Sequence, residues 1–425
     1  MIRFFAALFL VHLSAFAASA KNSVLGSTGK SDGWQSYCRL NDDAQTSVPN
    51  DAWDLQFFFY GDGIFINESS KTTFLEPSRE IRFYRAPGDD FSAVFSSDEV
   101  SGKRLWNDET SWQYGALNTL RDPNDPDDLG WGRKNSDGTA TGTRVFAVRL
   151  RDGQWKKFKI LSRDFFEYRL QYANLDGSAE KIVTIPLPDF SPLVFGYFSF
   201  EKGEMISSVP FDWDLVFQRY VTPLDDNMGG ILDYTVTGVL SNFGVQVAQA
   251  TQVNPATVAF ENYRDSLSAQ PDVIGYDWKS FDFTNSNEWT VYDDRAYFVA
   301  TRQGEIWKIV FIDFEGSATG NIVFQKFKVG DLSSTDDPES PLSSFFVFPN
   351  PSAGDFQVAL VCKKSDDHAL VSIFNTAGQS VFSNPTKLNE GLNVLEFNNL
   401  NLPSGLYFVK VETGGAARTM RLLRR

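Results

Sequence analysis

The stretch FDWDLVFQRY at residues 211–220 has a similar counterpart, DAWDLQFFFY, at residues 51–60 of the same chain. In each copy a Trp, a Leu and a Phe are spaced two apart, and residues at this spacing lie on one face of a strand. Burying such side chains is worth roughly 1.5–3 kcal/mol each. The pattern therefore predicts a core β-strand. It also places Asp54 and Asp214 on the opposite face, where a bond to a neighbouring loop is favoured over catalytic acid chemistry.

The duplication extends upstream of this strand. SYCRL at 36–40 corresponds to GYFSF at 196–200. Cys38 falls where the second copy has Phe198, which indicates that Cys38 packs as a small apolar side chain. The other cysteine, Cys362, lies far away along the chain, so the sequence predicts neither a disulfide framework nor a thiolate zinc site.

A second repeated block lies downstream. RVFAVRLRDGQWKKFKI at 144–160 corresponds to RAYFVATRQGEIWKIVFI at 295–312, and each predicts a hairpin with a Gly at its turn. Two blocks repeated in the same order indicate a domain duplication. The sequence predicts one copy at 21–190 and the other at 191–330.

Composition bounds the fold and the partners. The chain has 425 residues with 39 Phe, 14 Tyr and 10 Trp, and large flat side chains at alternating positions are typical of β-sheets. We expect an all-β protein of two tandem antiparallel β domains, followed by a small immunoglobulin-like β-sandwich. The net charge of −15 argues against binding to nucleic acid or to anionic membranes.

The amino-terminal residues have the pattern of an export signal. MIRFFAALFLVHLSAFAASA, residues 1–20, joins one Arg to a short apolar run and ends in a small-x-small site, which predicts cleavage after Ala20. This run is too short to favour a transmembrane segment. We therefore expect the protein to pass through the periplasm to the outer-membrane surface or the medium.

The carboxyl-terminal residues 342–425 alternate apolar and polar residues between Gly, Asn and Pro turns. PNPS at 349–352, NTAG at 375–378, LPSGLY at 402–407 and a basic tail resemble the C-terminal sorting domain of type IX secretion substrates of the Bacteroidetes. The resemblance implies a β-sandwich that the secretion machinery recognises. An ordinary adhesion module is the alternative. DLSSTDDPESP at 331–341 indicates a flexible linker before it.

Both copies resemble a second family, the HmuY haem-binding proteins. The resemblance rests on WDLVF, YFSF, RVFAVRLRDGQWKKFKI and EYRLQYANLDGS, and it implies an all-β, surface-exposed haem binder. Haem iron needs His, Met, Cys or Tyr ligands. The only histidines, His12 and His368, lie in the predicted signal peptide and sorting domain, so Met205 and Met228 are the candidate haem ligands. Gap-filling by Met205 and exposure of Met228 in a turn are the alternative.

Two further clusters are candidate sites. RDPNDPDDLGWG at 121–132 offers hard oxygen donors suited to calcium, with a solvated loop as the alternative. LWNDETSWQYG at 105–115 carries loop aromatics that could stack on a sugar or flat ligand, with core tethering as the alternative. The calcium candidates are Asp122, Asp125, Asp127 and Asp128, and the stacking candidates are Trp106, Trp112 and Tyr114.

These observations favour an exported, non-enzymatic binding protein. Ser-His-Asp and Cys-His catalysis are excluded between the two ends because that part of the chain has no His. A haem protein with Met ligands and a carboxylate-dependent glycan hydrolase remain the alternatives. No cofactor is expected, with haem or calcium as exceptions. The expected partners are the type IX machinery and a haem, glycan or protein ligand.

Overall fold

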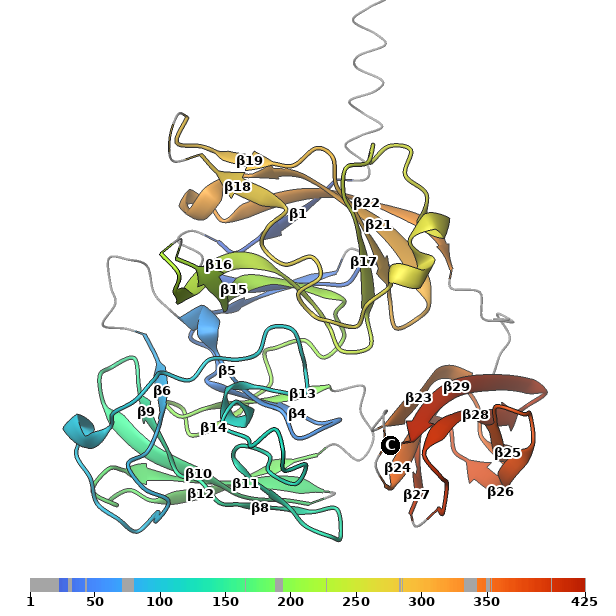
Figure 1. Ribbon diagram of the computed structural model, residues 1–425, viewed down its shortest axis with the longest axis horizontal. Helices are drawn as coiled ribbons and strands as arrows, with labels where there is room; N and C mark the ends of the chain where they lie inside the picture. The colour runs from blue at the N-terminus through green and yellow to red at the C-terminus, as the bar shows by residue number, and fades with distance from the viewer. Residues whose placement is uncertain are drawn as a thin grey trace, which may run out of the picture. The chain divides into compact units, whose positions relative to one another are not determined.

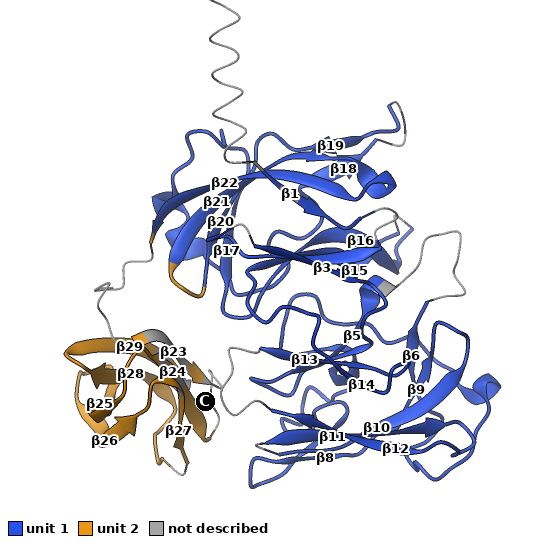
Figure 2. Cartoon of the chain, turned by 180° about the vertical axis from the view of Figure 1, so that it is seen from behind, with its two compact units in different colours: residues 1–187, 193–301, 305–330 blue, residues 188–192, 302–304, 331–425 orange. Residues whose placement is uncertain are grey.

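The computed structural model describes residues 23–29, 33–42, 44–70, 80–164, 166–187, 194–226, 228–282, 284, 286–331, 342–348, 352, 354–398 and 400–424. These residues form antiparallel strands and three-residue 3-10 helices, which confirms the predicted all-β class. The chain divides into two compact units, blue and orange in Figure 2, within residues 1–330 and mainly within 331–425. The predicted signal peptide, its cleavage site and all of the linker except Asp331 lie outside the described residues. None of the described helices is long and apolar enough to cross a membrane.

Four sheets are stacked as layers in the larger unit (Figure 1). The two inner sheets have four strands each and contain the repeated WDL stretches. One inner sheet has the order β14 (Glu204–Ile206), β13 (Phe195–Ser199), β4 (Leu55–Phe58) and β5 (Ile64–Ile66). The other has the order β16 (Ile231–Ser241), β15 (Leu215–Asp225), β2 (Trp34–Cys38) and β3 (Gln45–Pro49).

The two outer sheets cover these inner ones. The seven-stranded sheet has the order β12 (Lys181–Pro186), β11 (Glu167–Asn174), β10 (Trp155–Arg163), β8 (Ala140–Gly142) and β7 (Gly132–Lys134), with β9 (Phe146–Arg149) on β10 and β6 (Arg82–Arg85) on β9. The five-stranded sheet has the order β1 (Ser23–Ser27), β22 (Asn321–Asp331), β21 (Glu305–Phe314), β20 (Ala296–Ala300) and β17 (Gln246–Ala250).

Short elements complete the larger unit. The hairpin of β18 (Lys279–Phe281) and β19 (Trp289–Val291) is a separate two-stranded sheet. The 3-10 helices are η2 (Glu68–Ser70), η4 (Ser97–Glu99), η5 (Ala116–Asn118), η6 (Phe260–Asn262), η7 (Arg264–Ser266) and η8 (Gly316–Ala318).

The two predicted copies exchange strands. β2 from the first copy pairs with β15 of the second, with Cys38 opposite Leu215. Conversely, β13 from the second copy pairs with β4 of the first, with Phe198 opposite Leu55. The upstream hairpin of each copy thus completes the sheet of the other. The predicted division after residue 190 therefore does not separate the sheets, because each inner sheet contains strands from both sides of it.

Three apolar clusters separate the four layers. Leu215 and Phe217 of β15 point into the cluster shared with the five-stranded sheet, whereas Val216 and Tyr220 point into the cluster between the inner sheets. β15 is thus buried on both faces. Trp213 packs in the latter cluster and does not share a face with Leu215 and Phe217, contrary to the sequence pattern. The reason is that β15 begins only at Leu215, so strand alternation does not extend back to Trp213.

Both predicted hairpins are confirmed. β9 and β10 flank the turn at Gly153, and β20 and β21 flank the turn at Gly304. Each Gly has a positive φ, +88° and +87° respectively, which a residue with a Cβ rarely adopts. The burial predicted for Cys38 is also found, because it is almost fully enclosed in the core with the five-stranded sheet.

The smaller unit is the β-sandwich predicted for the carboxyl-terminal residues. Its core includes Val358, Ile373 and Val409, all fully buried. One sheet has the order β23 (Leu342–Phe348), β24 (Phe356–Cys362) and β27 (Gly391–Phe397). The other has the order β26 (Ser380–Leu388), β25 (Asp366–Asn375), β28 (Gly405–Thr413) and β29 (Ala416–Arg424).

Candidate binding site between the two copies

A small cavity lies where the two inner sheets face each other. Its volume is about 40 Å³, and residues of both copies line it. A water-sized group needs roughly 10–15 Å³ of such space, so the cavity has room for about three. Its wall combines aromatic, amide and carboxylate side chains: Trp53, Phe65, Trp112, Tyr220, Gln35, Gln56, Gln218, Glu68, Asp108 and Glu109.

Gln56 is the most unusual lining residue. Alternation along β4 turns Leu55 and Phe57 into the core shared with the seven-stranded sheet, so Gln56 faces the second copy. Its side chain is only 6% exposed, and no described residue hydrogen-bonds to its amide. Its amide nitrogen and oxygen keep some accessible surface, because neither is among the fully enclosed side-chain atoms that lack a partner. The amide of Gln218, on β15, also lines the cavity without a hydrogen-bond partner among the described residues.

Gln35, by contrast, is fully engaged and holds one wall in place. Its Oε1 accepts hydrogen bonds from the Tyr37 hydroxyl at 2.8 Å and from Trp53 Nε1 at 3.0 Å. Its Nε2 donates to Asn67 Oδ1 at 3.1 Å. Asn67 Nδ2 in turn donates to the Trp53 carbonyl at 2.8 Å, so these side chains form one connected hydrogen-bond network on this side of the cavity.

Three carboxylates, Glu68, Asp108 and Glu109, also line the cavity. Glu68 accepts the backbone N–H of Asn107 at 2.6 Å and that of Val221 at 3.0 Å. Burial outweighs these bonds and raises the pKa of Glu68 to about 7. Glu109 accepts the Thr222 hydroxyl at 2.6 Å. Within the described part of the chain, no Lys or Arg forms an ion pair with Glu68, Asp108 or Glu109.

The three predicted stacking aromatics do not form one face. Trp112 is buried between the inner sheets, where its Nε1 donates to the Ser241 carbonyl. Trp106 packs at the edge of the first core and donates from Nε1 to Asp233. Tyr114 is 38% exposed, with the Arg121 guanidinium 3.6 Å from its ring centroid. Trp106 and Trp112 thus tether their loop to the second copy, and Trp112 alone lines the cavity.

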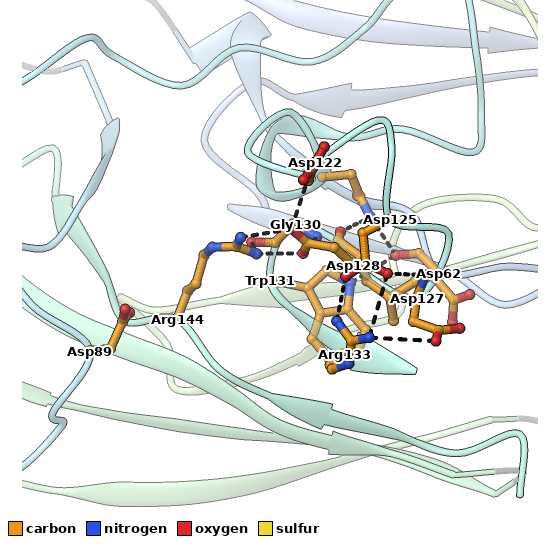
Figure 3. Close-up of polar contacts among 12 residues, drawn as sticks. Asp62, Asp89, Asp122, Asp125, Asp127, Asp128, Gly130, Trp131, Arg133 and Arg144 are labelled. Carbon is orange, nitrogen blue, oxygen red and sulfur yellow. Dashed lines mark hydrogen bonds and ion pairs between the residues drawn. The ribbon is translucent and has the colours of Figure 1, made fainter. Parts of the chain in front are cut away.

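The acidic loop at 121–132 is held by arginines (Figure 3). Arg144 forms a bidentate pair with Asp128 at 2.6 and 2.8 Å, and Arg133 contacts Asp125 at 2.5 Å. The Arg144 guanidinium holds the pKa of Asp128 far below its usual range. Among the described residues, no group of three or more His, Cys, Asp or Glu could hold a metal ion.

Calcium binding by Asp122, Asp125, Asp127 and Asp128 therefore stays a prediction that the geometry does not favour. Asp127 lies 3.6 Å from Arg133. Asp122 accepts the backbone N–H of Asn124 and donates its own N–H to Asp128. The charge of this loop is thus largely balanced within the protein.

The two candidate haem ligands lie in different parts of the larger unit, one on a strand and the other in a turn. Met205 lies on β14, opposite Phe198, and packs against the first core. Met228 lies in the β15–β16 turn and is 89% exposed. Nothing in the described structure brings the two sulfurs to opposite sides of one cavity. Haem ligation by this pair stays a prediction without geometric support.

Sequence reasoning did not single out Gln56, Gln218 or Glu68. One signal was available, because the alignment of DLQFF with DLVFQ sets Gln56 against Val216. A polar residue in a strand that is apolar in the other copy is typical of a local demand for hydrogen bonding. For Glu68 the sequence carried no such signal.

Comparison with known proteins assigns the smaller unit. Residues 346–423 match the family described as the Secretion system C-terminal sorting domain. This match indicates delivery by type IX secretion and export to the cell surface or the medium in Bacteroidetes. It confirms that part of the sequence analysis, whereas the HmuY-like resemblance of both copies stays a prediction.

The larger unit has no comparable assignment. No curated protein matches the chain. Similar solved structures include dimeric latent PorU from Porphyromonas gingivalis, at 12% identity and a TM-score of 0.18, covering 95% of this chain and 34% of that one. Another is the BSP domain of a biofilm associated protein, at 9% identity and a TM-score of 0.16, covering 97% and 69%. Similarity at these TM-scores carries no argument.

Proposed function

We propose that this protein is a type IX secretion cargo whose larger unit is a non-enzymatic binding protein. The observation that carries the proposal is Gln56, a residue only 6% exposed, whose amide lines the cavity between the copies without a hydrogen-bond partner among the described residues. Buried polar groups in folded proteins are nearly always hydrogen-bonded, so an exception calls for an explanation, and a bound polar group supplies one here. The aromatic and carboxylate walls supply the shape and polarity that small-ligand sites use.

The buried carboxylates nearest the WDL stretches support a non-enzymatic role. Asp54 is fully enclosed and is paired with Arg151 at 2.6 Å. Asp214 accepts the backbone N–H of Leu40 at 2.8 Å. These groups hold strands together, as the sequence analysis favours, which supports binding over hydrolysis of a glycan.

Export is tested by deleting residues 342–425 in the native host. The shortened chain should accumulate in the periplasm, and the full chain should reach the cell surface or medium. Its larger unit should still be folded, because separate sandwiches contribute little to one another's cores. Gln56→Leu in the full chain is the control and should be exported normally. Efficient export of the chain without residues 342–425 would contradict their assignment as the sorting domain.

Binding is tested on protein recovered from that host after export. Native mass spectrometry should show a small molecule bound to the wild type and absent from Gln56→Leu, which removes the amide. Gln45→Leu is the matched control, because Gln45 is exposed on β3, away from the cavity. The same bound mass in all three proteins, or none in any, would contradict the proposed binding site.

A further inference from the structure

We infer that the cavity between the two inner sheets binds an organic ammonium group, such as the end of a lysine side chain or of a polyamine. The inference rests on the proposed binding function and adds the chemical class of the ligand. It follows from three properties of the wall: an excess of hydrogen-bond acceptors, aromatic faces, and a small volume.

The acceptors outnumber the cations that could satisfy them. Glu68, Asp108 and Glu109 line the cavity without an ion pair from any described residue. Glu68 is buried, whereas Asp108 and Glu109 are half-buried and Asp108 accepts hydrogen bonds from the backbone N–H and hydroxyl of Thr110. A buried carboxylate such as Glu68 is costly without a counter-charge, and a bound cation removes that cost. An ammonium group carries three N–H donors, which the carboxylates and the carbonyl oxygens of Gln56 and Gln218 are suited to accept.

The nearby arginines do not supply the cation that would offset these carboxylates. Arg104 is paired with Glu80 at 2.6 Å and its guanidinium lies over Trp106, outside the cavity wall. Arg219 is among the lining residues, but on β15 it alternates with Gln218 and Tyr220. Its side chain therefore extends from the opposite face of that strand. The charge facing the cavity is thus predominantly negative.

Aromatic side chains complete the site. Trp112 and Phe65 meet edge to face at 5.4 Å between centroids, and Tyr220 lines the wall from the second copy. Ring faces attract ammonium groups by roughly 0.5–2 kcal/mol, most strongly where water is excluded. A site with carboxylates and aromatic rings favours an alkylammonium over a hydrated metal ion.

The volume of the cavity limits the size of the group that it can bind. About 40 Å³ is far below the roughly 300–1,000 Å³ of pockets that enclose whole ligands. A haem or a sugar ring is therefore too large, whereas an ammonium nitrogen with its adjoining methylene groups is of suitable size. The remainder of the ligand would stay outside the mouth.

The test uses the full chain without residues 1–20 and isothermal titration calorimetry with two amine probes. Cadaverine represents a polyamine, and acetyl-Gly-Lys-Gly-amide represents a peptide side chain. 1-Pentanol is the neutral probe of similar shape and should give no saturable heat. At least one amine should bind with 1:1 stoichiometry. The amine that binds more strongly shows whether the natural ammonium group belongs to a polyamine or to a lysine side chain.

Variants assign the binding to the cavity. Gln56→Leu and Glu109→Gln should each weaken the amine at least about tenfold, and Gln45→Leu should leave it unchanged. Glu68→Gln serves as a further variant if either of the first two fails to fold by circular dichroism. Equal amine affinity in all variants, or none in the wild type, overturns the inference. If mass spectrometry still finds a neutral molecule lost in Gln56→Leu, the proposed binding function stands and only the ligand class is wrong.

Discussion

Asp54 and Asp214 occupy equivalent places in the two copies, and each carboxylate accepts a backbone N–H from the other copy. Asp54 Oδ2 accepts the N–H of Phe200 at 2.6 Å, and Asp214 Oδ2 accepts the N–H of Leu40 at 2.8 Å. The repeated aspartate thus anchors the exchanged hairpin at the edge of its new sheet. The exchanged strands and the two WDL stretches are therefore parts of one arrangement.

The first prediction concerns the ion pair behind this anchor. Asp54→Ala leaves Arg151 largely buried and without its main counter-charge, since the two groups are 2.6 Å apart. Removing one partner of a buried pair costs about 3–5 kcal/mol. Urea unfolding followed by Trp fluorescence should show this loss. Asp265→Ala, at an exposed position, should change stability by less than about 0.5 kcal/mol. Equal effects of both substitutions would show that the anchor contributes little.

The second prediction concerns the exchanged hairpins. Residues 21–187 and 194–331, expressed separately, should each be poorly folded, because each lacks the strand that β4 or β15 pairs with. Produced together, they should co-purify as one complex with the circular dichroism spectrum of the intact body. Splitting the chain instead at the Gly304 hairpin turn is a control, because residues 21–304 then keep both exchanged pairs, β4 with β13 and β2 with β15, within one fragment. Two independently folded monomers from the first split would contradict the exchange.

The third prediction concerns pH. The pKa of Glu68 is raised to about 7 by burial, above its ordinary value of 4.5. A raised folded-state pKa means that its stabilising effect is complete below the unfolded-state pKa and is lost as pH rises through 7. Relative to Glu68→Gln, the wild type should therefore lose on the order of 3 kcal/mol of unfolding free energy between pH 4.5 and 7.5.

Glu99 is the opposite case and provides the control for that experiment. The Ser96 backbone N–H and hydroxyl lower the pKa of this exposed carboxyl. Its contribution should therefore be present at neutral pH and fade as pH falls through its folded-state pKa. The difference in unfolding free energy between the wild type and Glu99→Gln should change only weakly with pH, and it should increase as pH rises. If the difference in unfolding free energy between the wild type and Glu68→Gln did not change with pH, the Glu68 carboxyl would not be desolvated.

The fourth prediction concerns haem. Met228 is 89% exposed on a hairpin turn, whereas Met205 lies on β14 beside β13 and packs against the first core, so the pair offers no common axial geometry. Titration of haem into the full chain should give weak absorbance changes without a stoichiometric endpoint. Met205→Ala and Met228→Ala should each leave the titration unchanged. A tight 1:1 complex abolished by either substitution would restore the haem alternative.

Much of the fold could be predicted because it depends on short-range patterns. Alternating large apolar residues specify strands, and Gly153 and Gly304 specify turns that need a positive φ. The sorting domain could be recognised from several motifs in order. The arginine partners of the acidic loop could not be predicted from the sequence, because Arg133 and Arg144 form their ion pairs with it only in the folded chain.

The sequence by itself determined the all-β class and the sorting domain at residues 346–423, and it displayed the two repeated blocks, because strand period, turn chemistry and repeated motifs are local properties. Only the tertiary structure decided which copy each hairpin completes, since alternation tells which face of a strand is apolar but not which strand pairs with it. For the same reason, only the tertiary structure shows that Gln56 of β4 and Gln218 of β15 line the same cavity. The candidate site lies between the copies, so neither copy's sequence could display it.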